Sequence, residues 1–364
     1  MAAERDRSVA PPTISEVAAE AGVGRASAAR TLGGYGYVSP ELRERVLQAA
    51  EKLGYRANAL ARSMSTGVSH TLGLIVADIG NPFFAGVTRG ISDFSRSRGF
   101  DTIVLSTHED LEEEKVAVGV LMDKRVDGMI IASAAVARGE VAHIQDAVSR
   151  GIPVVLVDRA VEHLALDSVV IDNREASRRA VSHMIERGHR RIGFIWGPAV
   201  KKPITTRRAL TAAASQSLWT DGERLNGYLD ALDDAGIPFD ADLVMTEPKT
   251  EENATAAVAR MLALENRITG IFCTETDGMT GALRAVRSSG LRYPADVSLI
   301  GFDDSSWAAV MDPPLTMIEQ PMLELGARAA ETLLHQIDGA TPSGKMHTLE
   351  TRFIERASVA QWRP

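Results

Sequence analysis

Polar and aromatic residues that could bind a small molecule recur directly after short apolar runs in the second part of the chain. Asp158 and Arg159 follow one such run, and Asp303 follows another. Carboxylates and an arginine can share paired hydrogen bonds with sugar hydroxyls, and an aromatic ring can stack on a sugar face. The residues at such positions are Asp78, Asn81, Phe83, Phe84, Thr107, His108, Ser133, Asp158, Arg159, Asp172, Asn173, Trp196, Thr274, Glu275, Thr276, Asp303 and Asp304. Taken singly, Asp172, Asn173 and Asp304 are more typical of helix caps or turns.

The apolar runs themselves predict buried parallel strands. They are rich in Val, Ile and Leu and alternate with longer amphipathic segments, a pattern typical of α/β folds. Seven such units predict two doubly wound lobes, and ligands of these sheets bind outside the carboxyl ends of the strands. We therefore expect the polar residues above to meet in one cleft. The predicted strands are residues 72–76, 102–105, 128–131, 154–157, 192–195, 271–272 and 297–301.

A different pattern occupies residues 11–56, which predict an all-α headpiece. Thr13 and Glu16 form the two ends of a capping box, and Gly22 ends the apolar stripe of that first helix. A second helix over residues 25–32 follows a short glycine-containing turn, as in helix-turn-helix motifs, although other three-helix bundles share this pattern. A third helix opens with Ser39 as its cap and Pro40 in its first position. Its expected inward residues are Leu42, Val46, Leu47, Ala50 and Leu53.

The amino-acid sequence itself favours the helix-turn-helix motif over another three-helix bundle. TISEVAAEAGV at 13–23, YVSPELRERV at 37–46, LGY at 53–55 and NALARS at 58–63 closely resemble the headpiece of the LacI/GalR repressor family. The resemblance implies base reading by Arg25 and Ala26, with Arg30 one turn later, because the arginine fork suits a guanine edge. Thr13, Ser27, Tyr35 and Asn58 would position the protein on phosphates or sugars. The DNA-binding residues implied are Thr13, Arg25, Ala26, Ser27, Arg30, Tyr35, Asn58, Ala61 and Met64.

Several residues depart from the family pattern. Gly24 stands where the family usually has a capping serine, and Ala28-Ala29 replaces Val-Ser. In the hinge and linker predicted for residues 57–69, Met64 replaces the leucine that wedges into the minor groove, and an apolar methionine can serve the same purpose. Ala57 replaces the usual proline, which removes a restraint on the backbone. The operator sequence of relatives is therefore not transferable.

The remaining residues, 70–364, resemble the family's core, which is similar to type I periplasmic binding proteins. NPFF at 81–84, RGHRRI at 187–192, RLNGY at 224–228 and GFDDS at 301–305 carry this resemblance. It implies a first lobe near residues 70–168 and 302–330, and a second near 169–301 and 331–364. Phe83, Asp158, Arg159, Arg224 and Asp303 become the leading effector contacts. With the strand-end positions, the effector set is Phe83, Thr107, Ser133, Asp158, Arg159, Trp196, Arg224, Glu275 and Asp303.

This effector set favours ribose or a ribonucleoside and needs no cofactor or metal. Glu275-Thr276 replaces the Asn-Asp that usually follows the seventh strand, which weakens the pentose interpretation. A longer loop than usual over residues 197–223 could contact the ligand or act as a flap.

Composition agrees with a cytoplasmic regulator. The net charge is −8, but residues 1–69 carry +2 and the remainder −10. One cysteine excludes an internal disulfide, and no signal-peptide or membrane-length apolar run occurs, which disfavours a secreted solute-binding protein. An enzyme is also disfavoured. The segment GATPSGKM at 339–346 lacks the context and the hydroxyl of a phosphate loop, and His183 and His189 lack metal-ligating spacing.

The expected assembly is a homodimer on a near-palindromic operator. Helices near residues 84–98 and 278–290 are the expected dimer face, and the short tail after Phe353 carries no heptad repeat for a tetramer. An inducer that releases DNA is favoured, and a purine-type corepressor is the alternative.

Overall fold

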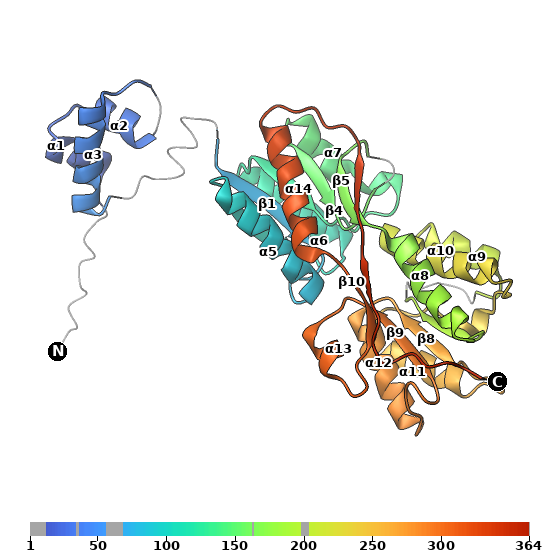
Figure 1. The fold of residues 1–364 in the computed structure, drawn as a ribbon. Helices are drawn as coiled ribbons and strands as arrows, with labels where there is room; N and C mark the ends of the chain where they lie inside the picture. The colour runs from blue at the N-terminus through green and yellow to red at the C-terminus, as the bar shows by residue number, and fades with distance from the viewer. Residues whose placement is uncertain (1–11, 34–35, 56–67, 162–163, 198–203, 364) are drawn as a thin grey trace, which may run out of the picture. The chain divides into compact units, whose positions relative to one another are not determined.

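The computed structural model describes residues 12–33, 36–55, 68–161, 164–197 and 204–363. The chain divides into two compact units, Met1–Thr71 and Leu72–Pro364 (Figure 1). Tyr35, Asn58, Ala61 and Met64, together with Ala57 and most of the predicted hinge, lie outside the described residues.

The first unit is a bundle of three helices, α1 (Ile14–Glu20), α2 (Arg25–Gly33) and α3 (Pro40–Leu53). The predicted caps are present: Thr13 and Glu16 form a capping box, and Ser39 accepts from the Leu42 amide. Small buried residues, including Ala18, Ala28 and Ala50, bring the helices together. Leu47 was expected to face inward, and this prediction is wrong. It is 45% exposed, because Val46 and Ala50 face inward and Ala49 fills the place beside them.

The second unit contains two six-stranded sheets. The first has the order β11-β5-β4-β3-β1-β2, and the second has the order β12-β10-β9-β8-β6-β7. All pairings with a described register are parallel except that of β10 with β12. The strands are β1 (Thr71–Val76), β2 (Asp101–Ser106), β3 (Gly128–Ile131), β4 (Val154–Val157), β5 (Ser168–Ile171), β6 (Ile192–Ile195), β7 (Val244–Met245), β8 (Gly270–Cys273), β9 (Ser298–Phe302), β10 (Thr316–Glu319), β11 (Met346–Leu349) and β12 (Arg352–Ile354).

Helices cover both faces of each sheet, so the fold is two doubly wound α/β lobes. The first lobe carries α5 (Pro82–Ser97), α6 (Leu111–Asp123), η1 (Arg138–Glu140), α7 (Ala142–Ser149) and α14 (Met322–Ile337). The second carries α8 (Asn173–Glu186), α9 (Arg207–Ala214), α10 (Trp219–Asp234), η2 (Ala241–Leu243), α11 (Glu251–Leu262), α12 (Thr276–Ser288) and α13 (Ser306–Val310). Within the described residues, no helix has the length and apolar character needed to cross a membrane.

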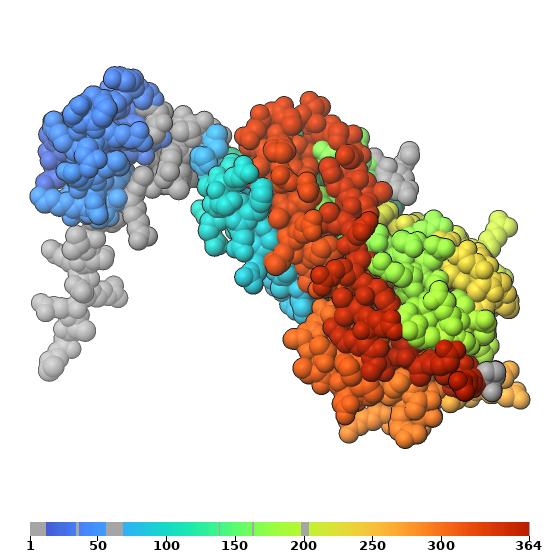
Figure 2. Space-filling view, viewed as in Figure 1, coloured from blue at the N-terminus to red at the C-terminus, as the bar shows by residue number. Residues whose placement is uncertain are grey.

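The predicted lobe boundaries are wrong at the C-terminal end. The first-lobe prediction for residues 302–330 holds for the start of α14, but β10 pairs with β9 in the second sheet. The second-lobe prediction for residues 331–364 holds for β12, but β11 pairs with β5 in the first sheet. The chain crosses between lobes three times, after β5, β10 and β11, and its C-terminal segment runs along both lobes on one face (Figure 2). The predicted boundaries omitted β10 and β11, and therefore misplaced the last two crossings.

Helices α5 and α14 of the first lobe approach each other through glycines. A Cβ at Gly326 would lie 2.2 Å from the Val87 carbonyl oxygen, and one at Gly90 would lie 2.2 Å from the Leu323 carbonyl oxygen. Because both contacts are with backbone atoms, an added methyl group must separate the helices.

Replacing Gly326 by Ala is therefore expected to lower the free energy of unfolding by about 2 kcal/mol or more. The matched control is Gly119→Ala on α6, where a Cβ meets nothing within 4 Å. That change should stabilise the protein by up to about 1 kcal/mol through helix propensity. Denaturant unfolding of both variants measures the difference, and equal stabilities would contradict the close approach.

Candidate functional site

The exposed face of α2 carries the residues expected to read DNA. Arg25, Ala26 and Arg30 are exposed, and Ser27 is half-buried. The Arg30 guanidinium donates to the Ala26 carbonyl oxygen over 3.3 Å and lies 3.5 Å from the Ser27 hydroxyl. Arg45 on α3 donates to the carbonyl oxygens of Ala21 and Gly22, which fixes the turn before α2. The bundle thus presents one short helix whose outer face carries two arginines and small side chains.

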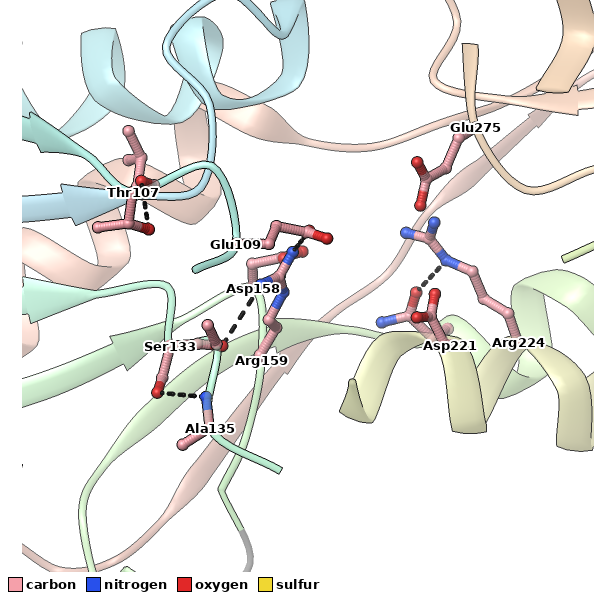
Figure 3. Close-up of polar contacts among 12 residues, drawn as sticks. Thr107, Glu109, Ser133, Ala135, Asp158, Arg159, Asp221, Arg224 and Glu275 are labelled. Carbon is pink, nitrogen blue, oxygen red and sulfur yellow. Dashed lines mark hydrogen bonds and ion pairs between the residues drawn. The ribbon is translucent and has the colours of Figure 1, made fainter. Parts of the chain in front are cut away.

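The second candidate site lies where the strands of the two lobes end (Figure 3). In the first lobe, Arg159 is buried after β4 and donates to Asp158 over 3.1 Å and to the carbonyl oxygen of Ser133 over 3.4 Å. It also forms an ion pair with Glu109, which follows β2. Burial raises the pKa of Asp158, although Arg159 opposes the rise. Burial would also raise the pKa of Glu109, but Arg159 lowers it below its usual range.

In the second lobe, Arg224 on α10 is held by three groups. Its Nε donates to the Asn173 side-chain oxygen over 2.8 Å, and its Nη1 donates to the Thr274 carbonyl oxygen over 2.8 Å. Its guanidinium carbon lies 4.0 Å from the centroid of the Phe302 ring, a cation–π distance. These contacts leave a rigid, buried cation whose remaining N–H groups are available to a ligand.

A half-buried lysine joins two acidic residues of the same lobe. The Lys249 ammonium lies 2.6 Å from the carboxylates of both Asp221 on α10 and Glu275 before α12. Burial would lower the pKa of Lys249, but the two carboxylates raise it above its usual value. The Asp221 carbonyl oxygen accepts from the indole N–H of Trp196 over 2.9 Å, so Trp196 holds the start of α10 against β6.

Asp303 follows β9 and is fixed by a residue from the next strand end. The Gln320 amide donates to the Asp303 carboxylate over 2.5 Å, and the Gln320 side-chain oxygen is buried without a partner. The backbone at Asp303, like that at Asp158 and Glu109, is left-handed, with φ of 67°, 68° and 61°. Non-glycine residues in this region are uncommon, and they cluster at active sites and ligand-binding sites.

Replacing Asp303 by Asn should stabilise the ligand-free protein increasingly as pH rises. Burial raises the pKa of Asp303 to about 6 from 3.8, against the attraction of Arg224. The folded state thus favours the protonated carboxyl. This preference adds up to about 3 kcal/mol to the free energy of unfolding below about pH 4, and the contribution is lost as pH rises through about 6.

An amide does not ionise, so the melting temperature of D303N relative to the natural protein should rise between pH 5 and pH 8. A difference that stays constant over this range would contradict the raised pKa.

The structure brings together five of the nine expected effector residues. Asp158 lies near Arg159, Arg224 and Glu275, and Asp303 lies near Arg224, Glu275 and Asp158. The others have internal partners. The Ser133 hydroxyl donates to buried Glu114, and the Thr107 hydroxyl donates to the Val76 carbonyl oxygen. Phe83 packs edge-to-face on Phe84, and Trp196 is buried in the core.

Sequence reasoning missed four residues of this cluster. Glu109 directly follows the predicted strand-end pair Thr107-His108. Gln320 follows β10, Lys249 follows β7, and neither strand was expected. Asp221 lies within residues 197–223, which were expected to form a loop. That expectation is corrected, because α9 and the start of α10 occupy part of the segment.

The combined cluster offers both acceptors and donors at short range. Within the described residues, no group of three or more His, Cys, Asp or Glu is placed to hold a metal ion. Carboxylates beside guanidinium groups suit a ligand with several hydroxyls, because each hydroxyl can donate to one and accept from the other. The charged residues are Glu109, Asp158, Arg159, Asp221, Arg224, Lys249, Glu275 and Asp303.

Comparison with known proteins identifies both units. Residues 13–58 match the model of "Bacterial regulatory proteins, lacI family", and residues 69–357 match that of "Periplasmic binding proteins and sugar binding domain of LacI family". The transcriptional regulator CelR of Thermobifida fusca is 33% identical over 359 residues, covering 95% of this chain and 98% of CelR.

Two solved structures share the fold. A CelR–cellobiose complex has a TM-score of 0.68 at 31% identity and covers 95% of this chain and 99% of that one. The Lac repressor dimer bound to operator has a TM-score of 0.80 at 23% identity and covers 96% and 99%.

Proposed function

Because the chain belongs to the LacI family of DNA-binding transcription regulators, we propose that it is a repressor whose operator affinity is set by a sugar-like or nucleoside-like effector. The observation that carries this proposal is the charged cluster between the lobes, in which Asp158 lies near both Arg159 and Arg224 and Asp303 lies near Arg224. The protein would act on operator DNA in the cytoplasm and catalyse no reaction, as its relatives are transcription regulators.

The donor and acceptor set supports a polyhydroxylated effector. Asp158 and Asp303 can accept from hydroxyls, while Arg159 and Arg224 can donate to them. Ribose and ribonucleosides therefore stand first among the candidates. The solved complex of the relative CelR contains cellobiose, which supports a saccharide as the effector class.

The proposed mechanism couples the cleft to a homodimer on DNA. Two headpieces would read the half-sites of a near-palindromic operator. Closure of one lobe on the other would change the geometry at which the headpieces leave the core. Effector and operator affinities must then change by the same factor, because coupling is reciprocal.

Operator titrations with and without effector test the proposal. We expect ribose, a ribonucleoside or a related sugar to weaken operator binding by at least about fivefold, within the usual range of allosteric coupling. Tighter binding would replace the inducer by a corepressor. If the protein binds no DNA sequence more tightly than it binds nonspecific duplex, the proposed function itself is overturned.

Arg25→Ala is expected to weaken specific operator binding by about 1–3 kcal/mol, or roughly 5- to 150-fold, because a bidentate arginine–guanine contact is lost. Nonspecific binding should change much less. The control is Arg43→Ala, which removes an exposed arginine from α3 rather than from α2. Competition against nonspecific duplex at fixed salt measures both, and equal losses on the two duplexes would argue against base reading by Arg25.

A further inference from the structure

A cavity of about 240 Å³ lies between the two lobes. The first lobe supplies Ala135, Val136 and Ala160 from the loops after β3 and β4. The second supplies Trp219, Glu223 and Asn226 from α10, with Thr211 and Ala214 from α9. Ser215 and Ser217 also line it. Its walls therefore combine small apolar and hydroxyl-bearing side chains, one aromatic ring and a polar edge.

This cavity borders the charged cluster on the chain and in space. Ala160 directly follows Arg159, and Glu223 directly precedes Arg224. The Ala135 amide donates to the Ser133 hydroxyl over 3.1 Å, and the Ser133 carbonyl oxygen accepts from Arg159. Figure 3 shows Ala135 beside Ser133 and Arg159, with Arg224 and Asp221 across the gap between the lobes. A ligand held by Arg159 and Arg224 therefore has this cavity next to it.

The second wall is built by the segment that is longer than in the family pattern. Helix α9 is capped by Thr206, whose hydroxyl accepts from the Ala209 amide over 3.2 Å, and it is anchored by buried Leu210. Arg207 forms a two-pronged ion pair with Asp233 on α10. At its other end the helix lies close to α10, where a Cβ at Gly222 would meet the Ala214 carbonyl oxygen at 3.3 Å. The wall is thus held in place by α10.

The size and lining of the cavity fit one further ring. Its volume equals that of about eight water molecules at roughly 30 Å³ each, smaller than a drug-sized pocket. Small side chains leave room for a flat or chair-shaped ring, and an indole can stack on it. Asn226 donates to the Glu223 carboxylate over 3.3 Å, and this pair can form hydrogen bonds with a ring edge.

We propose that the effector is a two-ring glycoside, with its sugar in the charged cluster and its second ring in the cavity beside Trp219. This inference rests on the proposed function, because it takes the cluster to be the effector site. The second ring is joined at the sugar's anomeric carbon and is either a nucleobase or another sugar.

Calorimetric titration of the full-length protein tests the inference with matched pairs of ligands. The pairs are ribose with adenosine or uridine, and glucose with cellobiose. One two-ring ligand should bind at least tenfold more tightly than its monosaccharide. Trp219→Ala should remove at least tenfold of that ligand's affinity and leave the monosaccharide's affinity unchanged. The ligand pair in which affinity increases shows whether the effector is a nucleoside or a disaccharide.

Ala160→Phe provides a second test, because it fills the cavity from the opposite lobe without removing a wall. It should exclude the two-ring ligand and retain the monosaccharide, which also shows that the variant is folded. Trp307→Ala, which removes a tryptophan packed at α13 in the second lobe, is the control and should change neither affinity.

Equal affinities within both ligand pairs, or loss of monosaccharide and glycoside affinity in parallel in Trp219→Ala, would overturn the inference while leaving the proposed function intact. If no sugar or nucleoside of either size binds, the proposed effector class fails as well.

Discussion

Arg224→Ala is expected to weaken effector binding by about 30-fold to several thousandfold, the range of about 2–5 kcal/mol for truncating a buried charged hydrogen-bonding partner. The guanidinium is fixed by Asn173, the Thr274 carbonyl oxygen and the Phe302 ring, so it meets a ligand without further ordering. Its loss also leaves Asp303 without the nearby cation that lowers its pKa. Calorimetry with the identified effector measures the change.

The effect should be confined to effector binding. Operator affinity in the absence of effector should be unchanged, because the recognition helix lies in the other unit. Arg174→Ala on α8 is the control, since that arginine is 52% exposed and pairs with Asp230 at the surface. If Arg224→Ala and Arg174→Ala bind effector equally well, the cluster is not the effector site.

The fold was predictable from the sequence wherever local patterns determine it. The caps Thr13 and Ser39 and the apolar runs of the central strands each act through neighbouring residues, and the structure has them where expected. Strand β10 lies next to the edge of the second sheet just before a crossing between lobes, and β11 lies at the edge of the first sheet after that crossing. Their lobe is decided by pairing with β9 and β5, more than ten residues away in the chain, and local periodicity does not encode that choice.

The candidate site was predictable where side chains immediately follow strands. Asp158, Arg159, Glu275 and Asp303 were found because parallel strands end at one edge. Lys249 and Gln320 follow strands of two and four residues that are too short or too mixed to detect. Trp196 satisfied the same positional rule, yet it is buried, because the rule gives position along the chain and not the direction of the side chain.

Lys249→Met should strongly destabilise the protein. Removing the ammonium leaves Asp221, which is 3% exposed, and Glu275 beside it without the cation that they share. Breaking a buried ion pair by removing one partner costs about 3–5 kcal/mol, because the remaining charge is left uncompensated. Chemical denaturation at pH 8 measures the loss.

The surface provides a control at the same distance. The Lys115 ammonium also lies 2.6 Å from a carboxylate, that of Glu112, but their side chains are 39% and 79% exposed. Lys115→Met should therefore change stability by no more than about 1 kcal/mol. The contrast attributes the cost in Lys249→Met to burial, since the three ion pairs share one N–O distance.

The deficit of Lys249→Met should also shrink as pH falls. Burial raises the pKa of Asp221, and loss of the Lys249 charge raises it further. At lower pH the Asp221 carboxyl is therefore protonated and no longer needs a cation beside it. Adding Asp221→Asn to the variant should recover part of the stability at pH 8 and little near pH 5. A deficit that is independent of pH and unaffected by Asp221→Asn would contradict the role of the charge, because methionine keeps the Cβ and Cγ atoms with which Lys249 lies against Gly197.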